Sequence, residues 1–335
     1  MKLATSYFGN RIPRHVARDM AALRGQGFAR VIHTFSENDH AFYAETIGEL
    51  VKISHEEGLE VLLDPWGVGR IFGGEAFSNW ITEDPDLCQR TRSGRPLAGA
   101  CLNHPGLRER LEQWTLAAAA TGADGVFWDE PHWVPRGPRN PQGEPCICPH
   151  CRQHAEKLFG RPIDLTAVGA EEIEHLQAES VLALLQHLSD HAAALDLPSS
   201  VCLLPRGVLG QPPLSWERVA GMGHIDEFGT DPYWQAFGIE DPVERDRFID
   251  EQAGSACAAA RAARIPVMLW IQAFRIPADR EGDLLAGARR LLRHAPDTVA
   301  LWGFEACAHM SALRCERPAQ LWTALLELLH SGASR

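Results

Sequence analysis

The order of apolar segments constrains the fold of this 335-residue chain more than any other feature of the sequence. Short apolar or β-branched segments alternate with longer segments in which apolar residues recur about every 3.6 positions, as expected of strands and amphipathic helices in turn. The predicted strands cover residues 3–7, 29–34, 60–63, 125–128, 200–204, 227–230, 266–271 and 298–303. Helices are predicted at residues 14–26, 42–57, 107–121, 171–195, 246–263, 284–294 and 320–329.

A closed (β/α)8 barrel, the TIM barrel, is the fold that these alternating strands and helices predict. A doubly wound open sheet is the alternative, and it would place a glycine-rich phosphate turn after the first strand. Residues 7–11 read Tyr-Phe-Gly-Asn-Arg instead, and no Walker-type Gly-Lys-Ser/Thr run occurs in the sequence. We therefore expect one α/β barrel domain over residues 1–335, with an elaborated loop at 131–170 after the fourth strand.

The balance of charges argues against partners with a phosphate backbone. The chain has 32 Lys and Arg against 44 Asp and Glu, a formal charge of -12, so most of its surface repels nucleic acid and anionic membranes. No apolar run approaches the ~20 residues that span a bilayer, and the first residues, MKLATSYFGNR, lack the apolar core of a secretory signal. We expect a cytoplasmic protein with a small-molecule substrate, and the sequence leaves its oligomeric state open, a homo-oligomer included.

Polar and aromatic residues follow the predicted strands, at the barrel end where enzymes of this fold place catalytic groups. The candidates after the third and fourth strands are Asp64, Trp66, Asp129, Glu130, His132 and Trp133. Those after the fifth and sixth strands are Arg206, Asp231, Tyr233 and Trp234. Those at the ends of the seventh and eighth strands are Trp270, Gln272, Trp302 and Glu305. Asp226 and Glu227 begin the sixth strand at the opposite end, so we expect a structural role for them.

Paired carboxyl groups beside aromatic rings are typical of carbohydrate chemistry. Glycosidic bond cleavage uses one carboxylic acid to protonate the leaving oxygen and a second carboxylate to attack carbon or activate water. Aromatic rings pack against the C–H face of a sugar, and we expect such a pocket wall from Trp66, Trp133, Tyr233, Trp234 and Trp302. The alternative is that the Asp-Pro pairs are strand-ending turns and the tryptophans belong to the core.

Among the carboxyl groups, we expect Glu130 to act as catalytic acid or base and Asp231 to be its partner across the barrel mouth. Adjacent strand residues point in opposite directions, so Asp129 remains the alternative catalytic group if Glu130 turns away. Asp64 and Glu305 are expected to orient sugar hydroxyls.

A cluster of cysteines indicates a metal site. Cys146, Cys148 and Cys151 form a Cys-x-Cys-x-x-Cys motif, and Cys101 is the natural fourth ligand of a structural zinc ion. Zinc would then join the loops after the third and fourth strands. His104 or His150 as the fourth ligand, and free thiols at all of these positions, remain the alternatives.

The same motifs, over residues 94–159, resemble the barrel domain of family 42 glycoside hydrolases, the β-galactosidases, whose cysteines at such positions hold zinc. In that family an Asn-Glu pair ends the fourth strand, and the resemblance implies that Glu130 is the acid/base. Asp129 replaces the Asn, and Gln272 stands near the expected position of a nucleophilic Glu. The chain is also similar to the α-glycosidase clan that includes family 36, which implies catalytic roles for Asp129 and Asp231.

These observations predict a glycoside hydrolase that acts on a small oligosaccharide or glycoside. A sugar lyase or isomerase on the same barrel, using His132, Tyr233 or Arg206, is the second hypothesis. A barrel that binds carbohydrate without catalysis is the third.

Overall fold

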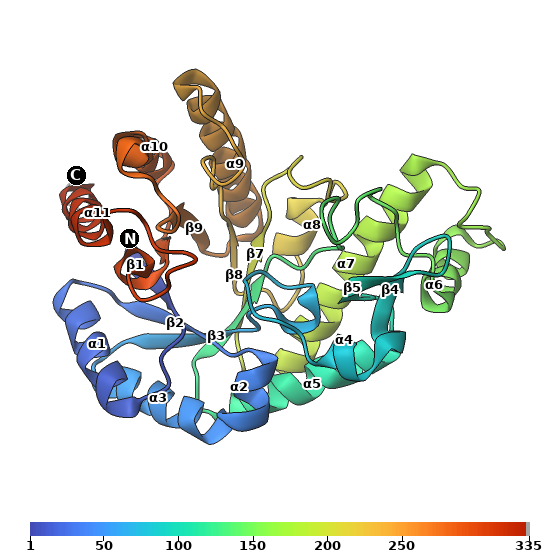
Figure 1. The fold of residues 1–335 in the computed structure, drawn as a ribbon, viewed down its shortest axis with the longest axis horizontal. Coiled ribbons are helices and arrows are strands. Elements are labelled where there is room, and N and C mark those ends of the chain that lie inside the picture. The colour runs from blue at the N-terminus through green and yellow to red at the C-terminus, as the bar shows by residue number, and fades with distance from the viewer. Residues whose placement is uncertain (333–335) are drawn as a thin grey trace.

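The computed structural model describes residues 1–332 and consists of a closed parallel barrel surrounded by helices (Figure 1). Strand β1 pairs with β2 on one side and with β10 on the other, which closes the sheet. This closure confirms the predicted TIM barrel and excludes the open sheet. The barrel strands are β1 (Lys2–Tyr7), β2 (Arg30–Thr34), β3 (Glu60–Asp64), β6 (Gly125–Asp129), β7 (Ser199–Leu203), β8 (Glu227–Thr230), β9 (Val267–Gln272) and β10 (Thr298–Trp302).

The outer helices match the predicted periodic segments, and most of them begin at a proline. The main ones are α1 (Pro13–Gly25), α3 (Ala44–Glu56), α5 (Pro105–Ala120), α7 (Ala170–Ala193), α9 (Pro242–Ala263), α10 (Glu281–Leu292) and α11 (Pro318–Gly332). Proline suits the first helical position because its missing N–H has no partner there in any case. The Asp241 side chain caps α9 by accepting from the backbone N–H groups of Val243 and Glu244. No helix within residues 1–332 is long and apolar enough to cross a membrane.

Two apolar cores hold the barrel together. The larger one lies between the strands and the helices, and the smaller one fills the barrel interior with side chains such as Ile32, Leu62, Phe127 and Met268. Filling of the interior by inward-facing side chains is the rule for this fold. Towards the carboxyl ends of the strands the interior becomes aromatic, and any chemistry must take place above this floor.

Two long loops cover one side of the barrel mouth. The β3 loop (residues 65–104) contains helix α4 (Trp80–Glu83) and an antiparallel hairpin of β4 (Cys88–Arg90) and β5 (Pro96–Ala100). The β6 loop (residues 130–169) contains helix α6 (Pro149–Phe159). The loops are joined where the Ile147 N–H donates to the Arg90 carbonyl at 2.9 Å, so the hairpin and α6 lie side by side (Figure 1). Elaboration therefore affects both loops, whereas the sequence predicted it only for the second.

Candidate active site

Four carboxyl groups meet at the carboxyl end of the barrel: Asp64 ends β3, Asp129 ends β6, Glu130 follows it, and Asp231 follows β8. We call these residues the carboxyl cluster. Asp64 and Asp231 are only 0% and 2% exposed. Both oxygens of Asp64 and Oδ1 of Asp231 are buried without a hydrogen-bond partner among the described residues. Buried polar atoms are almost always satisfied in folded proteins, so these orphaned oxygens are candidates for contact with a ligand.

The backbone at the end of β6 brings both adjacent acids to the same place. Glu130 has a φ of 46°, a left-handed conformation that is rare outside glycine, and this turn overrides the strand alternation. A Cβ atom on Gly73 would overlap Asp129 Oδ2 and approach Glu130 Oε2 to 3.1 Å. Both carboxyl groups therefore border Gly73.

Burial raises the pKa of Asp64, Asp129 and Glu130 well above the ordinary values, and repulsion from neighbouring carboxylates raises it further. Burial also raises the pKa of Asp231, to about 7. A hydrogen bond between Glu130 and Asp231 favours the proton on Glu130, because it raises the pKa of Glu130 and lowers that of Asp231. The two carboxyl groups therefore titrate as a coupled pair, in which Glu130 is the better proton donor.

The structure adds one acid that the sequence reasoning missed. Glu75 lies in the β3 loop, and its charge raises the pKa of Asp64, Asp129 and Glu130. It stands far beyond the end of β3 in sequence, so its position in the chain carries no sign of this role. The approach depends on Gly74, whose φ of +100° admits the Trp66 ring where a Cβ atom would lie.

Aromatic rings form the floor and one wall of the site. Trp66 stacks on Phe8 with centroids 5.6 Å apart, Phe8 contacts Trp302 at 5.6 Å, and Trp302 contacts Trp270 at 5.7 Å. Trp270 and Trp302 are buried in the barrel interior, whereas Trp66 is partly exposed. Tyr233 is partly exposed as well, and both burial and the Asp231 charge raise its pKa. Among the predicted wall residues, Trp66 and Tyr233 are therefore the two that stay partly exposed.

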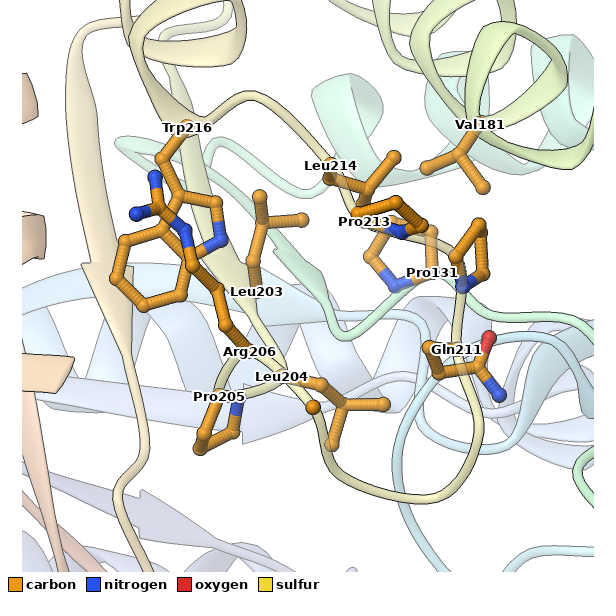
Figure 2. Close-up of a pocket in the computed structure, with 12 residues that line it drawn as sticks. Pro131, Val181, Leu203, Leu204, Pro205, Arg206, Gln211, Pro213, Leu214 and Trp216 are labelled. Carbon is orange, nitrogen blue, oxygen red and sulfur yellow. The ribbon is translucent and has the colours of Figure 1, made fainter. Parts of the chain in front are cut away.

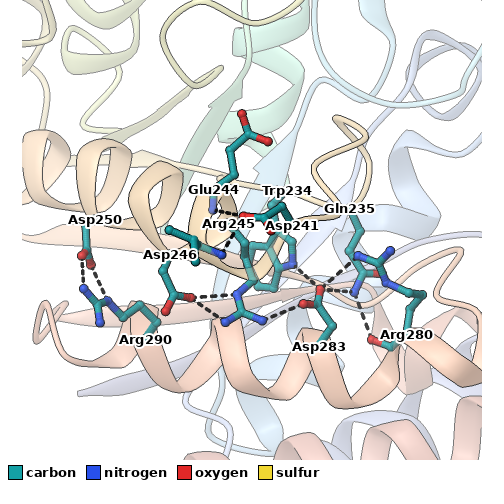
Figure 3. Close-up of polar contacts among 11 residues, drawn as sticks. Trp234, Gln235, Asp241, Glu244, Arg245, Asp246, Asp250, Arg280, Asp283 and Arg290 are labelled. Carbon is teal, nitrogen blue, oxygen red and sulfur yellow. Dashed lines mark hydrogen bonds and ion pairs between the residues drawn. The ribbon is translucent and has the colours of Figure 1, made fainter.

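Trp234 does not belong to this wall, which corrects the sequence-based expectation. It is fully buried, its indole N–H donates to Asp283 Oδ2 at 3.1 Å, and its ring packs against Gly287 of α10 (Figure 3). Asp283 also accepts from Arg245 at 2.6 Å. Trp234 thus joins the β8 loop to the outer helices, because Tyr233 takes the inward position.

Trp133 and Arg206 also point away from the carboxyl cluster. Trp133 is 3% exposed, and its indole N–H donates to the Gln177 carbonyl of α7 at 3.0 Å. The Arg206 guanidinium lies over the Trp216 ring at 4.5 Å and pairs with Glu217 at 3.4 Å. Beside them is a crevice of about 30 Å³ lined mainly by proline and leucine side chains (Figure 2), which has room for one or two water molecules but not for a sugar.

Gln272 and Glu305 complete the candidates on the last strands. The Gln272 amide accepts from the Ala236 N–H at 3.1 Å and donates to the Phe274 carbonyl at 2.9 Å, so it joins the β8 and β9 loops. Glu305 is exposed on the rim, and it begins three successive residues with φ of 49°, 51° and 57°. Such left-handed runs cost energy and cluster at functional sites. His132 donates from Nδ1 to the Glu130 carbonyl at 2.6 Å, and burial lowers its pKa to about 4.

Four cysteines form a second cluster, which can hold a metal ion. The sulfur atoms of Cys101, Cys146, Cys148 and Cys151 are buried and lie within 4.8 Å of one another. Cys101 Sγ is 3.4 Å from Cys148 Sγ and 3.5 Å from Cys151 Sγ. A tetrahedral zinc with Zn–S bonds of about 2.3 Å needs sulfur separations of about 3.8 Å, whereas a disulfide needs about 2 Å.

Two N–H groups point at these sulfur atoms. The Arg90 N–H donates to Cys146 Sγ at 3.3 Å, and the Asn103 amide donates to Cys151 Sγ at 3.4 Å. Donors around the sulfurs stabilise thiolates and are common around metal-bound cysteines. His104 instead caps α5 by accepting from the Gly106 N–H at 3.1 Å, which leaves Cys101 as the fourth sulfur. The donor set fits a structural zinc.

No known family profile matches the chain, and no curated protein is similar to it in sequence. Solved structures share its fold. An endo-1,4-β-mannanase from Rhizomucor miehei superimposes with a TM-score of 0.65 at 11% identity, covering 100% of this chain and 95% of that chain. GH5_18 from Streptomyces cattleya, in complex with GlcNAc, gives 0.62 at 14% identity, with 100% and 80% covered.

An endo-β-1,4-mannanase from Thermotoga petrophila gives a TM-score of 0.60 at 9% identity, with 100% of this chain and 76% of that chain covered. At such identities the likeness concerns the fold. This chain is therefore a (β/α)8 barrel of the kind on which these glycoside hydrolases are built.

Proposed function

We propose that this protein is a glycoside hydrolase whose catalytic pair is Glu130 and Asp231. The observation that carries the proposal is the group of carboxyl side chains at the carboxyl end of the barrel, among which burial raises the pKa of Glu130 and of Asp231. An acid that stays protonated near pH 7 is what protonation of a glycosidic oxygen requires. The mannanase neighbours support carbohydrate as the substrate class, since their fold is the same.

In this mechanism Glu130 gives its proton to the leaving oxygen while Asp231 attacks the anomeric carbon or activates water, which requires the bound sugar to hold the two carboxyl groups about 5 Å or more apart. Asp129 borders the same Gly73 and is the substitute for either role. The unsatisfied oxygens of Asp64 would accept hydrogen bonds from sugar hydroxyls. The Trp66 and Tyr233 rings would pack against the sugar C–H groups. Glu305 on the rim is a further hydroxyl partner, and His132 orients the Glu130 backbone.

We also propose a structural zinc ion at Cys101, Cys146, Cys148 and Cys151. Four thiolates leave no coordination position for a catalytic water, so the ion would join the two long loops and take no part in the reaction. When bound, it would link the end of β5 to the start of α6.

Hydrolysis of a panel of nitrophenyl glycosides, in α and β anomers, tests the proposal. Glu130→Gln and Asp231→Asn should each lower kcat on any hydrolysed substrate by 100-fold or more, on the order of general acid catalysis, with the far-ultraviolet circular dichroism unchanged. Asp279→Asn is the matched control, because Asp279 is an exposed acid on the turn before α10 and is not among the groups that raise the pKa values of the carboxyl cluster. Near-normal turnover in both site variants would refute the assignment, and sugar binding without turnover in the wild type would favour a non-catalytic barrel.

A further inference from the structure

We propose that Arg70 and Arg139 form a subsite for an anionic substituent, a carboxylate or a phosphate, on the carbohydrate substrate. The identity of the ligand as a carbohydrate rests on the proposed function, whereas the binding of the anion rests on the two guanidinium groups alone.

The two arginines come from different loops and meet beside one strand. Arg70 ends the short turn after β3, and its Nη1 donates to the Ala76 carbonyl at 2.6 Å. Arg139 sits at the tip of a tight turn closed by a bridge between Gly137 and Asn140, and its Nη1 donates to the Ala98 carbonyl at 3.1 Å. The Arg70 carbonyl lies 3.3 Å from the Cβ position of Gly99, so both residues line the same stretch of β5.

Neither guanidinium has a counterion. Arg11, Arg245 and Arg290 are paired with aspartates. Arg70 and Arg139 form no ion pair with an acid within residues 1–332, and each side chain makes one hydrogen bond there, to a backbone carbonyl. Both are partly exposed, so their remaining N–H groups can reach a ligand. Burial and the Arg70 charge lower the pKa of Arg139, as expected of two cations held close together.

Partial burial of two cations without a counterion costs free energy of folding. The chain has 44 Asp and Glu against 32 Lys and Arg, so it has acids enough to pair with both arginines. Burial raises the pKa of Glu75, and the nearby charge of Arg70 opposes that rise, yet Glu75 and Arg70 do not form an ion pair. Planar guanidinium groups bind carboxylate and phosphate through parallel N–H bonds. A bound anion would therefore accept hydrogen bonds from the remaining N–H groups of Arg70 and Arg139.

A single residue joins the turn that carries Arg70 to the proposed catalytic acid. His132 connects them, since its backbone N–H donates to the Ile71 carbonyl at 2.8 Å, next to Arg70, and its Nδ1 donates to the Glu130 carbonyl. The charges of Arg139 and Arg70 also lower the pKa of His132. A sugar with its glycosidic oxygen at Glu130 would thus carry its anionic group towards the arginines.

Isothermal titration with glucuronate, glucose 6-phosphate and glucose tests the proposal without any need for turnover. At least one anionic sugar should bind the wild type 10-fold or more tightly than glucose, and Arg70→Ala and Arg139→Ala should each remove that preference. Whether glucuronate or glucose 6-phosphate is preferred decides between carboxylate and phosphate. Arg289→Ala is the matched control, because Arg289 is exposed on α10, and Arg139→Gln provides a second variant if Arg70→Ala loosens its loop.

Equal affinity for the charged and neutral sugars in the wild type, or a preference that survives in Arg139→Ala and Arg139→Gln, would overturn the subsite. Hydrolysis of neutral glycosides would then leave the proposed glycosidase intact. Conversely, arginine-dependent binding of an anionic sugar with no hydrolysis of nitrophenyl glucuronides or 6-phosphoglycosides would support the subsite and count against the glycosidase.

Discussion

The carboxyl cluster lacks the counterions that buried acids normally require. Asp64, Asp129, Glu130 and Asp231 form no ion pair within residues 1–332, and burial raises the pKa of each of them. A buried acid without a partner responds by keeping its proton. Each of the four side chains therefore keeps its proton to a higher pH than an exposed carboxyl group does. A raised pKa lets such a group act as a proton donor at a pH where an exposed carboxyl group is already ionised.

Activity should consequently depend on pH in a way that ordinary carboxyl groups would not produce. Asp231 must be ionised and Glu130 protonated, so kcat/KM should rise as the pH increases through about 7, the pKa of Asp231, and fall at higher pH as Glu130 ionises. A pH profile on the best nitrophenyl glycoside measures both limbs. A plateau from pH 4 to 6 with no rise near neutrality would contradict the shared-proton pair.

Gly73 should tolerate no side chain. Gly73→Ala places a methyl group against Asp129 Oδ2 and Glu130 Oε2, so we expect kcat to fall by 10-fold or more while the fold persists, because the carboxyl groups must shift by a fraction of an ångström. Gly282→Ala is the control, since nothing lies within 4 Å of its Cβ position in α10, and alanine there should stabilise the helix by about 0.5–1 kcal/mol. Kinetics and thermal unfolding of both variants provide the comparison.

At the scale of elements, the site depends on the β3 loop, which is anchored by a buried acid in α2 (Glu37–Phe42). Glu37 accepts from the Gly69 N–H at 2.7 Å, from the Ser78 hydroxyl at 2.6 Å and from the Trp80 N–H at 2.8 Å. These bonds fix both ends of the segment that carries Gly73 and Glu75. The β3 loop is thus held at both ends of this segment, and glycines occupy the positions where the segment comes close to the carboxyl cluster.

Glu37→Gln should therefore impair catalysis without touching the reacting groups. A glutamine keeps one acceptor oxygen, so at least one of the three donors loses its partner, at a cost of about 1–3 kcal/mol. We expect a lower thermal midpoint together with a several-fold loss of kcat. Glu49→Gln, at an exposed position of α3, should change neither quantity, and full activity in Glu37→Gln would show that the anchor does not position the site.

The cysteine cluster is the second anchor of the loops. Protein purified without added metal should contain one zinc ion per chain by elemental analysis. Cys101→Ser or chelation should speed proteolysis within the β3 and β6 loops, because a bound zinc ion would cross-link them in addition to hydrogen bonds such as that from Ile147 to Arg90. Cys257→Ser is a control at a buried cysteine of α9 outside the cluster. Absence of zinc together with free titration of all four thiols would contradict the metal site.

For the whole molecule, the barrel separates stability from chemistry. At the amino ends of the strands, Glu227 accepts from Ser200, Thr298 and Arg30, and the Asp226 carboxylate accepts from the Ser199 N–H, as expected for residues at this end of the barrel. At the carboxyl ends the acids are left unsatisfied. The unsatisfied acids at the carboxyl ends of the strands therefore lower the stability of the fold, and the hydrogen-bonded acids at the amino ends offset this loss.

Removal of one unsatisfied acid should stabilise the whole protein in a pH-dependent way. The folded-state pKa of Asp231, about 7, lies above its unfolded value, so its stabilising contribution is complete below pH ~4 and is lost as the pH rises through the folded value. Asp231→Asn should hence exceed the wild type in free energy of unfolding at pH 8, by an amount on the order of 1–3 kcal/mol, and by much less at pH 5. Asp279→Asn should show no such difference.

The sequence by itself determined the barrel, the end of it at which the carboxyl groups gather, and the four clustered cysteines, because these follow from periodicity and from the position of residues along the chain. Only the tertiary structure decided where side chains beyond the strand ends point. The left-handed turn at Glu130 joined both adjacent acids, Tyr233 took the inward place and sent Trp234 to α10, and the β4–β5 hairpin went unpredicted. Glu75 and the arginine pair came together through loops of unrelated sequence position, since loop conformation depends on packing against the rest of the molecule, which local spacing does not encode.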